Sequence, residues 1–183
     1  YIMGYLGNQI TTVFPTSISV DTATIATANI SNQLTDANMA SGSVLQVVSV
    51  DSSTQENTTS TSYVASSGVT ASITPSSTSS KILTICSPSL RVYEDNGSNA
   101  NMRFALSRDG GSNFLYQAIL RNFDYGNSGA LIDISISQTF LDSPSSTSAL
   151  TYTMYVKIVG GDQVEINPDG NNKSTLTLME IAG

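Results

Sequence analysis

Apolar and polar side chains alternate along most of the chain after residue 43. The clearest run places Ile132, Ile134, Ile136 and Phe140 on one face of an extended segment, with Asp133 among the polar residues of the other face. A period of two residues is typical of a β-strand with one face buried. The segment 81–86 is apolar on both faces, which is expected of a strand inside a sandwich.

Strand signals recur at short intervals, with almost no helical periodicity. The expected strands cover 44–50, 69–73, 81–86, 101–107, 114–119, 132–140, 151–158, 164–166 and 175–181. Asp-Gly and Gly-Gly pairs separate several of them, and such pairs accept the backbone conformations of tight turns. The pattern predicts an all-β fold, an antiparallel β-sandwich of jelly-roll type, over residues 44–183.

Residues 1–43 follow neither period. Their apolar residues stand singly among Thr, Ser, Asn and Ala, so we expect an extended N-terminal arm that anchors or assembles the protein. Apolar side chains without a core of their own must be buried on another surface. The expected arm contacts are Val13, Ile18, Ile25, Ile30, Leu34 and Met39. The alternative is a disordered leader.

The composition excludes several kinds of binding partner. The first eighty residues contain no Lys or Arg, Ser and Thr exceed a quarter of the chain, and the net charge is −7. Nucleic acid and anionic lipid both require clustered basic residues, so neither is an expected partner. We expect neither a secretory signal nor membrane insertion, because no apolar stretch has the required length.

The composition also excludes most kinds of catalytic site. The chain has no His, which excludes Ser-His and Cys-His nucleophile pairs, so we expect no enzyme, cofactor or metal. Cys86 is expected to be a small core residue. A carboxylate pair including Asp133 could support glycosidase chemistry, but a solvated or inter-subunit hydrogen bond is the simpler reading. The Asp- and Asn-rich loops 94–99 and 167–172 suit turns, with calcium as the alternative.

Several segments resemble virion structural proteins of marine bacteriophages, in particular tail-fibre-like proteins. They are 42–48, 71–83, 140–152 and 174–181. The resemblance implies a trimeric, β-rich projection on the exterior of the phage particle, held to other virion proteins through the arm and able to attach to a host surface glycan. The alternatives are a head fibre or capsid decoration protein, and a carbohydrate-binding or filament-forming surface protein of cellular origin.

Residues 91–129 fall in a gap of this resemblance, and we expect host specificity there. Tyrosine rings beside amide side chains suit sugars, because a ring stacks on the apolar face of a pyranose. The candidate glycan-binding residues are Tyr93, Asp95, Asn96, Asn99, Tyr125 and Asn127. The simpler alternative is that these tyrosines are half-buried parts of the sandwich and the polar residues form turns.

Overall fold

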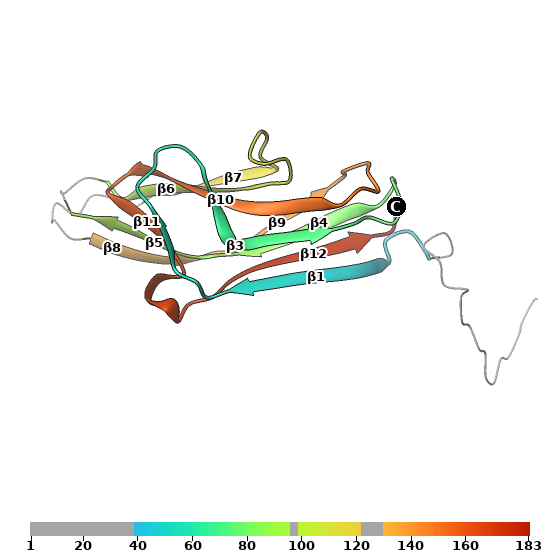
Figure 1. Ribbon diagram of the computed structural model, residues 1–183, viewed down its shortest axis with the longest axis horizontal. Helices are drawn as coiled ribbons and strands as arrows, with labels where there is room; N and C mark the ends of the chain where they lie inside the picture. The colour runs from blue at the N-terminus through green and yellow to red at the C-terminus, as the bar shows by residue number, and fades with distance from the viewer. Residues whose placement is uncertain (1–38, 96–98, 122–129) are drawn as a thin grey trace, which may run out of the picture. The chain divides into compact units, whose positions relative to one another are not determined.

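The computed structural model describes residues 39–95, 99–121 and 130–183 (Figure 1). Within these ranges the chain forms β-strands and one 3₁₀ turn, η2 (Pro168–Gly170), and no α-helix. The strands are β1 (Val44–Ser52), β2 (Glu56–Thr58), β3 (Val64–Ile73), β4 (Lys81–Ser87), β5 (Ser89–Glu94), β6 (Asn101–Ser107), β7 (Tyr116–Arg121), β8 (Ala130–Ser135), β9 (Gln138–Asp142), β10 (Leu150–Gly160), β11 (Gln163–Ile166) and β12 (Ser174–Ile181). All strand pairs are antiparallel.

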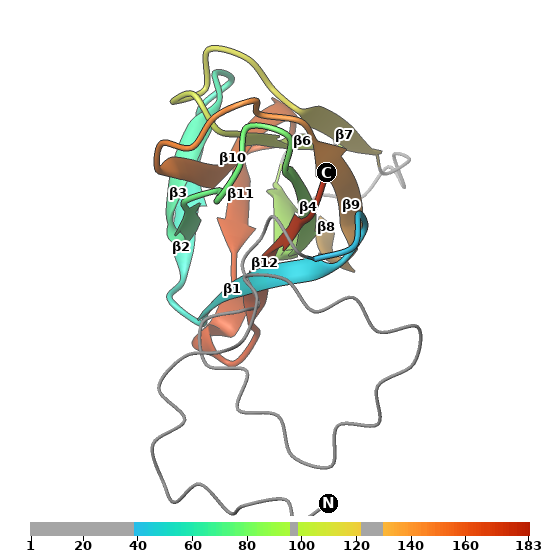
Figure 2. The same ribbon diagram turned by 90° about the vertical axis from the view of Figure 1, so that its right-hand side faces the viewer.

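The strands form three four-stranded sheets, two of which are continuous. One sheet has the order β1-β12-β4-β9 and the next has the order β2-β11-β5-β8. Along the chain β1 is followed by β2, β4 by β5, β8 by β9, and β11 by β12, so each strand of one sheet continues into the strand at the same place in the other. Together they make one long layer. The sheet β3-β10-β6-β7 makes the facing layer (Figures 1 and 2).

The strand order is that of a jelly roll. When each continuous pair is counted as one long strand, the first layer reads 1-8-3-6 and the second 2-7-4-5. This order results when a long antiparallel ribbon folds back on itself into two Greek keys. The predicted all-β sandwich of jelly-roll type is therefore confirmed for the described residues.

The long layer breaks where two of its strands are interrupted. Pro88 lies between β4 and β5, and a proline cannot donate a hydrogen bond to a strand ladder. On the neighbouring strand the chain leaves the layer after Ile166 and returns at Ser174 through η2. The two interruptions are joined, because the Ser89 backbone N–H donates to Ser174 Oγ at 3.0 Å.

The core lies between the layers. Alternate side chains point inward, so β4 buries Ile82 and Cys86 while β12 buries Leu176 and Leu178. These pack in one cluster with Phe104, Met102, Tyr152 and Met154 of the facing layer. Cys86 is fully buried, as predicted, and burial raises the pKa of its thiol to about 11.

Strand β1 begins at Val44, the predicted start of the sandwich. The arm residues Val13, Ile18, Ile25, Ile30 and Leu34 lie outside the described residues, and their assembly role stays a prediction. No helix in the described part of the chain is long and apolar enough to cross a membrane.

Candidate functional site

The outer face of the sheet β1-β12-β4-β9 carries a row of apolar side chains. The strand register aligns Val47 with Met179, Met179 with Leu83, and Leu83 with Leu141, so one residue from each strand forms the row. Alternation along each strand turns all four away from the core. Val47 and Leu141 are 54% and 48% exposed, and the inner strands hold Met179 and Leu83 half-buried.

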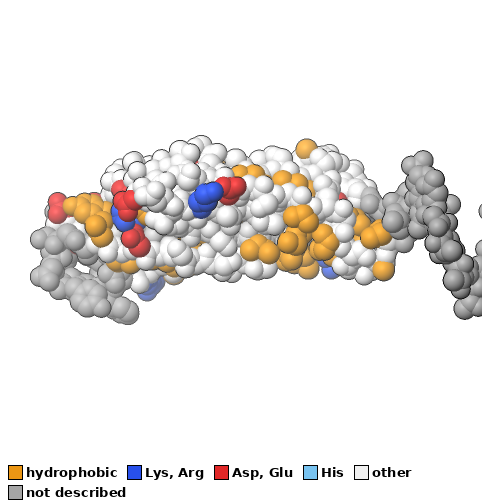
Figure 3. Space-filling view, turned by 90° about the horizontal axis from the view of Figure 1, so that it is seen from below, with side chains coloured by type: hydrophobic (Ala, Val, Ile, Leu, Met, Phe, Trp, Pro, Cys, Tyr) orange, Lys and Arg blue, Asp and Glu red, His pale blue; other side chains and the backbone are white. Residues whose placement is uncertain are grey.

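The apolar row, as we call these four residues, has further apolar residues on both sides. Ile181 pairs with Val44, which is 50% exposed, and Ile85 lies two residues beyond Leu83 on the same face. Hydrophobic side chains gather on this face in the space-filling view (Figure 3). A contiguous apolar patch on one face of a sheet is typical of a contact surface, whereas isolated exposed apolar residues are common on any protein.

Hydroxyl groups form the next row. The register places Ser49, Thr177, Ile85 and Thr139 side by side, and the Ser49 and Thr177 hydroxyls are 2.8 Å apart. Neither this row nor the apolar row contains a charged side chain. Because hydroxyls on adjacent strands hydrogen-bond to each other, few polar groups on this part of the face would lose a partner if another surface covered it. The free-energy cost of removing this part of the face from water is therefore small.

One charged residue, Lys81, lies on this face beside Ile181, and the other charges of the face lie farther along the layer. Lys173 Nζ lies 3.0 Å from Asp51 Oδ2. Beyond it, Arg91 donates to Asp133 at 2.6 and 2.9 Å and to Asp169 at 2.9 and 2.8 Å. In Figure 3 one basic side chain lies against the hydrophobic patch, and the groups of basic and acidic side chains stand apart from it. The outer face of the long layer thus runs from an apolar end, which includes Lys81, through hydroxyls to an end that carries ion pairs.

The Arg91 cluster accounts for Asp133. The guanidinium, which bonds both carboxylates, holds the pKa of Asp133 and of Asp169 below their usual values. A carboxylate fixed in this way is a poor general acid. The prediction that Asp133 hydrogen-bonds rather than catalyses fits this geometry, although its partner is Arg91 of the same chain.

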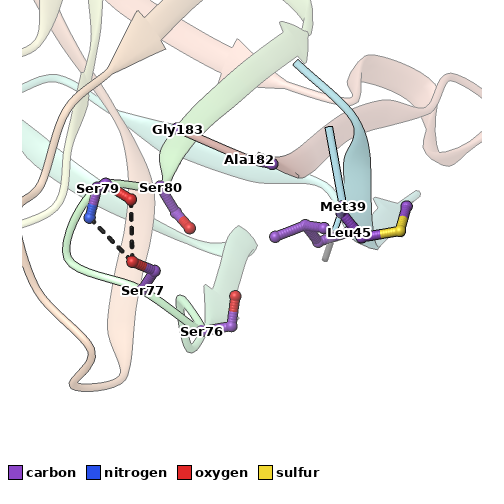
Figure 4. Close-up of a pocket in the computed structure, with 8 residues that line it drawn as sticks. All are labelled: Met39, Leu45, Ser76, Ser77, Ser79, Ser80, Ala182 and Gly183. Atoms are coloured by element: carbon purple, nitrogen blue, oxygen red, sulfur yellow. Dashed lines mark hydrogen bonds between the residues drawn. The ribbon is translucent and has the colours of Figure 1, made fainter. Parts of the chain in front are cut away.

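A pocket of about 350 Å³ adjoins the apolar end. It is lined by Ser76, Ser77, Ser79 and Ser80 of the β3–β4 connection, by Ala182 and Gly183, and by Met39 and Leu45 (Figure 4). Ser77 accepts a hydrogen bond from the backbone N–H of Ser79, and their hydroxyls lie 3.0 Å apart. The backbone near the pocket is fixed by the bonds from Gly42 N to Ala182 O and from Ala182 N to Ser43 O, both 2.8 Å.

Glu180 anchors this end from inside the sandwich. It is buried, and its carboxylate accepts hydrogen bonds from Gln46 Nε2 at 2.5 Å and from the Ser76 backbone at 2.7 Å. Burial alone would raise the pKa of Glu180, but the hydrogen bonds from Gln46 and Ser76 outweigh it and hold the pKa below its usual value. The carboxylate is therefore structural, and it ties β1, β12 and the β3–β4 connection together.

The predicted glycan-binding residues are only partly within the described structure. Tyr93 lies one residue before the end of β5, where the Asp162 backbone N–H donates to its carbonyl at 2.9 Å, and the Asp95 N–H donates to Asp162 Oδ2 at 2.7 Å. The neighbouring carboxylate of Asp95 is the main reason that the pKa of Tyr93 is raised. Asn99 is exposed. Asn96, Tyr125 and Asn127 lie outside the described residues, so a site formed by the six residues stays a prediction.

No cluster of Cys, Asp and Glu in the described ranges could hold a metal ion. The loop 167–172, considered above for calcium, is a turn: Asn167 has φ 54° and ψ 57°, donates from Nδ2 to Thr54 O at 3.0 Å, and accepts from Ser174 Oγ at 2.7 Å. Asp169 in this turn is bound to Arg91.

Comparisons with known proteins add distant structural matches only. No family model and no curated protein matches the chain. The VP2 subviral particle of infectious bursal disease virus matches at a TM-score of 0.38 and 14% identity, over 75% of this chain and 33% of that chain. VP2 of the Gx strain matches at 0.36 and 12%, over 93% and 43%. Dimeric latent PorU of Porphyromonas gingivalis matches at 0.32 and 9%, over 79% and 14%.

This chain spans less than half the length of each of those proteins. The identities and TM-scores are too small to carry an argument about function. The apolar row and the fold are the observations that bear on function.

Proposed function

We propose that this protein is a non-enzymatic structural subunit of a bacteriophage particle, which assembles with copies of itself into a trimeric, tail-fibre-like projection. The observation that carries the proposal is the apolar row, which lies on an exposed face of a jelly roll. A sandwich buries only one face of each sheet, and four aligned apolar side chains on the other face gain free energy when a partner covers them.

A second copy of the chain is the partner that we favour for this face. Two copies each carry a net charge of −7 and repel one another over most of their surface. The apolar and hydroxyl rows contain no charge, so they let copies approach without bringing carboxylates together. A closed ring of copies then repeats one contact, as symmetric oligomers do. Threefold symmetry follows from the resemblance to phage fibre proteins.

In this proposal residues 1–43 attach the projection to other virion proteins. Met39, the last of the expected arm contacts, lines the pocket beside the apolar end, and this supports attachment from that end of the sandwich. A host surface glycan would be bound by the loops away from this end. The jelly roll itself is compatible with either a projection or a shell component, because the fold is used in capsid proteins and in lectins alike.

A head fibre or capsid decoration protein is the second candidate. Uncharged, hydroxyl-rich faces also suit a subunit that covers a shell. Immunogold electron microscopy with antibodies against the sandwich, on purified particles that carry this chain, separates the two. Label at the tail supports the fibre, whereas label spread over the head supports decoration. A chain that is absent from every particle but present on a cell surface overturns both.

A further inference from the structure

We infer that the outer face of the sheet β3-β10-β6-β7 holds a binding site for an acidic saccharide, formed by Arg103, Lys157, Tyr63, Phe114 and Gln117. The site lies in the opposite layer from the apolar row. It extends the proposed role by giving the projection a ligand, and it rests on separate observations.

The strand register brings two cations together. Arg103 of β6 pairs with Lys157 of β10, and both point away from the core because their neighbours Met102, Phe104, Val156 and Ile158 are buried. Like charges directly opposite one another destabilise a sheet. Within the described ranges, no carboxylate lies within ion-pairing distance of either cation, whereas Arg91, Arg108 and Lys173 all have acidic partners.

Lys81 and Arg121 also have no ion pair within the described ranges, but only Arg103 and Lys157 lie directly opposite one another there. The protein has fourteen acidic and seven basic residues, so carboxylates are available to neutralise most cations. A bound carboxylate or sulfate that bridges Arg103 and Lys157 would remove their mutual repulsion, and charge-assisted hydrogen bonds are the strong ones. The uncompensated pair therefore points to an anionic ligand.

Aromatic rings lie directly beside the cations. Tyr63 and Phe114 have ring centroids 4.4 Å apart, and Phe114 contacts the Tyr155 ring edge-on at 5.6 Å. Lys157 Nζ lies 4.8 Å from the centre of the Tyr63 ring. The two connections that supply these rings, before β3 and before β7, lie on the outer side of this layer (Figures 1 and 2). Both rings are half-buried, so part of each remains accessible.

A polar group completes the site. The Tyr63 hydroxyl donates to Gln117 Oε1 at 2.8 Å, which fixes the ring across the sheet and leaves the amide nitrogen of the exposed Gln117 as a donor. Ile119, which is 36% exposed and pairs with Arg103, adds an apolar edge. Rings for the apolar face of a sugar, an amide for its hydroxyls and two cations for its acid group together favour an acidic saccharide over an acidic peptide.

The test measures binding of dextran sulfate, neutral dextran and poly-glutamate to the full chain by isothermal titration calorimetry. We expect dextran sulfate to bind, neutral dextran not to bind, and poly-glutamate to bind more weakly than dextran sulfate. The double variant Arg103→Gln and Lys157→Gln should lose about tenfold or more in affinity. The control variant Lys81→Gln and Lys173→Gln, which has the same net charge, should bind as the wild type does. Tyr63→Ala should weaken dextran sulfate more than poly-glutamate.

Equal loss in the two double variants, or no binding of dextran sulfate, overturns the site. Poly-glutamate that binds as tightly as dextran sulfate overturns the saccharide in favour of an acidic peptide. The thermal unfolding temperature of each variant shows that the sandwich is intact. A protein that self-associates but binds no dextran sulfate would overturn this site and leave the proposed assembly unaffected.

Discussion

The hydroxyl of Tyr152 donates a 2.8 Å hydrogen bond to Asp142 Oδ2, and this bond joins the two layers of the sandwich. Tyr152 comes from β10 and Asp142 from β9, in opposite layers, and both are buried. Arg108 Nε lies 2.7 Å from the same carboxylate oxygen. Burial, and next the bond to Asp142, raise the pKa of Tyr152, so the hydroxyl stays protonated as a donor.

Tyr152→Phe should therefore destabilise the fold by about 1–3 kcal/mol, because a buried carboxylate oxygen loses a donor. Chemical denaturation followed by circular dichroism measures the change. Tyr93→Phe serves as the matched control, since Tyr93 is half-buried and at a strand end, and it should change the free energy of unfolding far less. Equal effects of the two substitutions would contradict a bond that holds the layers together.

Glu180 gives the fold a pH dependence of known sign. Its pKa is lowered in the folded state, so its contribution to stability is complete above the unfolded pKa of about 4.3 and is lost as pH falls below that value. Glu180→Gln should be less stable than the wild type by about 1–3 kcal/mol near neutral pH. The difference in free energy of unfolding should shrink as pH is lowered toward 3.

Urea denaturation of both proteins across this pH range measures that difference. Asp109, Asp133 and Asp169 also have lowered pKa values, so both proteins should lose stability in acid. The comparison with Glu180→Gln isolates the one carboxylate. A difference that stays constant with pH would mean that Glu180 contributes through packing rather than through its charge.

Gly68 is required where β3 passes close to Glu56 and Ser52. A Cβ at this position would lie 2.3 Å from Ser52 Oγ and 3.1 Å from Glu56 Oε1. Glu56 Oε1 already accepts bonds from Ser66 Oγ at 2.9 Å and from the Gly68 N–H at 2.8 Å, so the carboxylate has little room to move. Gly68→Ala should lower the melting temperature markedly, whereas Ser67→Ala at the exposed neighbouring position should not. Similar melting temperatures for the two variants would rule out this close approach.

The strands were predictable because alternation depends on neighbouring residues alone. Ile132, Ile134 and Ile136 reveal their common face in the sequence, and the structure places them along one edge of the long layer. The segment 81–86 was misleading in one respect. Apolar residues on both faces suggested burial on both faces, but Leu83 and Ile85 face outward and are half-buried. These two side chains therefore lie on the outer face of the long layer, away from the core between the layers.

The apolar row and the proposed saccharide site both depend on strand register, which the sequence does not reveal. The apolar row requires Val47, Met179, Leu83 and Leu141 to align across four strands that are far apart in the chain. Arg103 and Lys157 are likewise distant in sequence. The sequence pattern indicated Tyr93 and Tyr125 for sugar binding but not Tyr63 and Phe114, because the proximity of these two rings arises only when two connections meet over one sheet.

The molar mass of the full-length protein at micromolar concentration, measured by sedimentation equilibrium, is the decisive experiment for the assembly proposal. We predict a trimer for the wild type. The variant with Val47→Asp and Leu141→Asp should be monomeric with an unchanged melting temperature, because both side chains are about half exposed and outside the core. The control Val64→Asp, an exposed valine of the other layer, should remain trimeric. A monomeric wild type, or a double variant that still forms trimers, would contradict assembly through the apolar row.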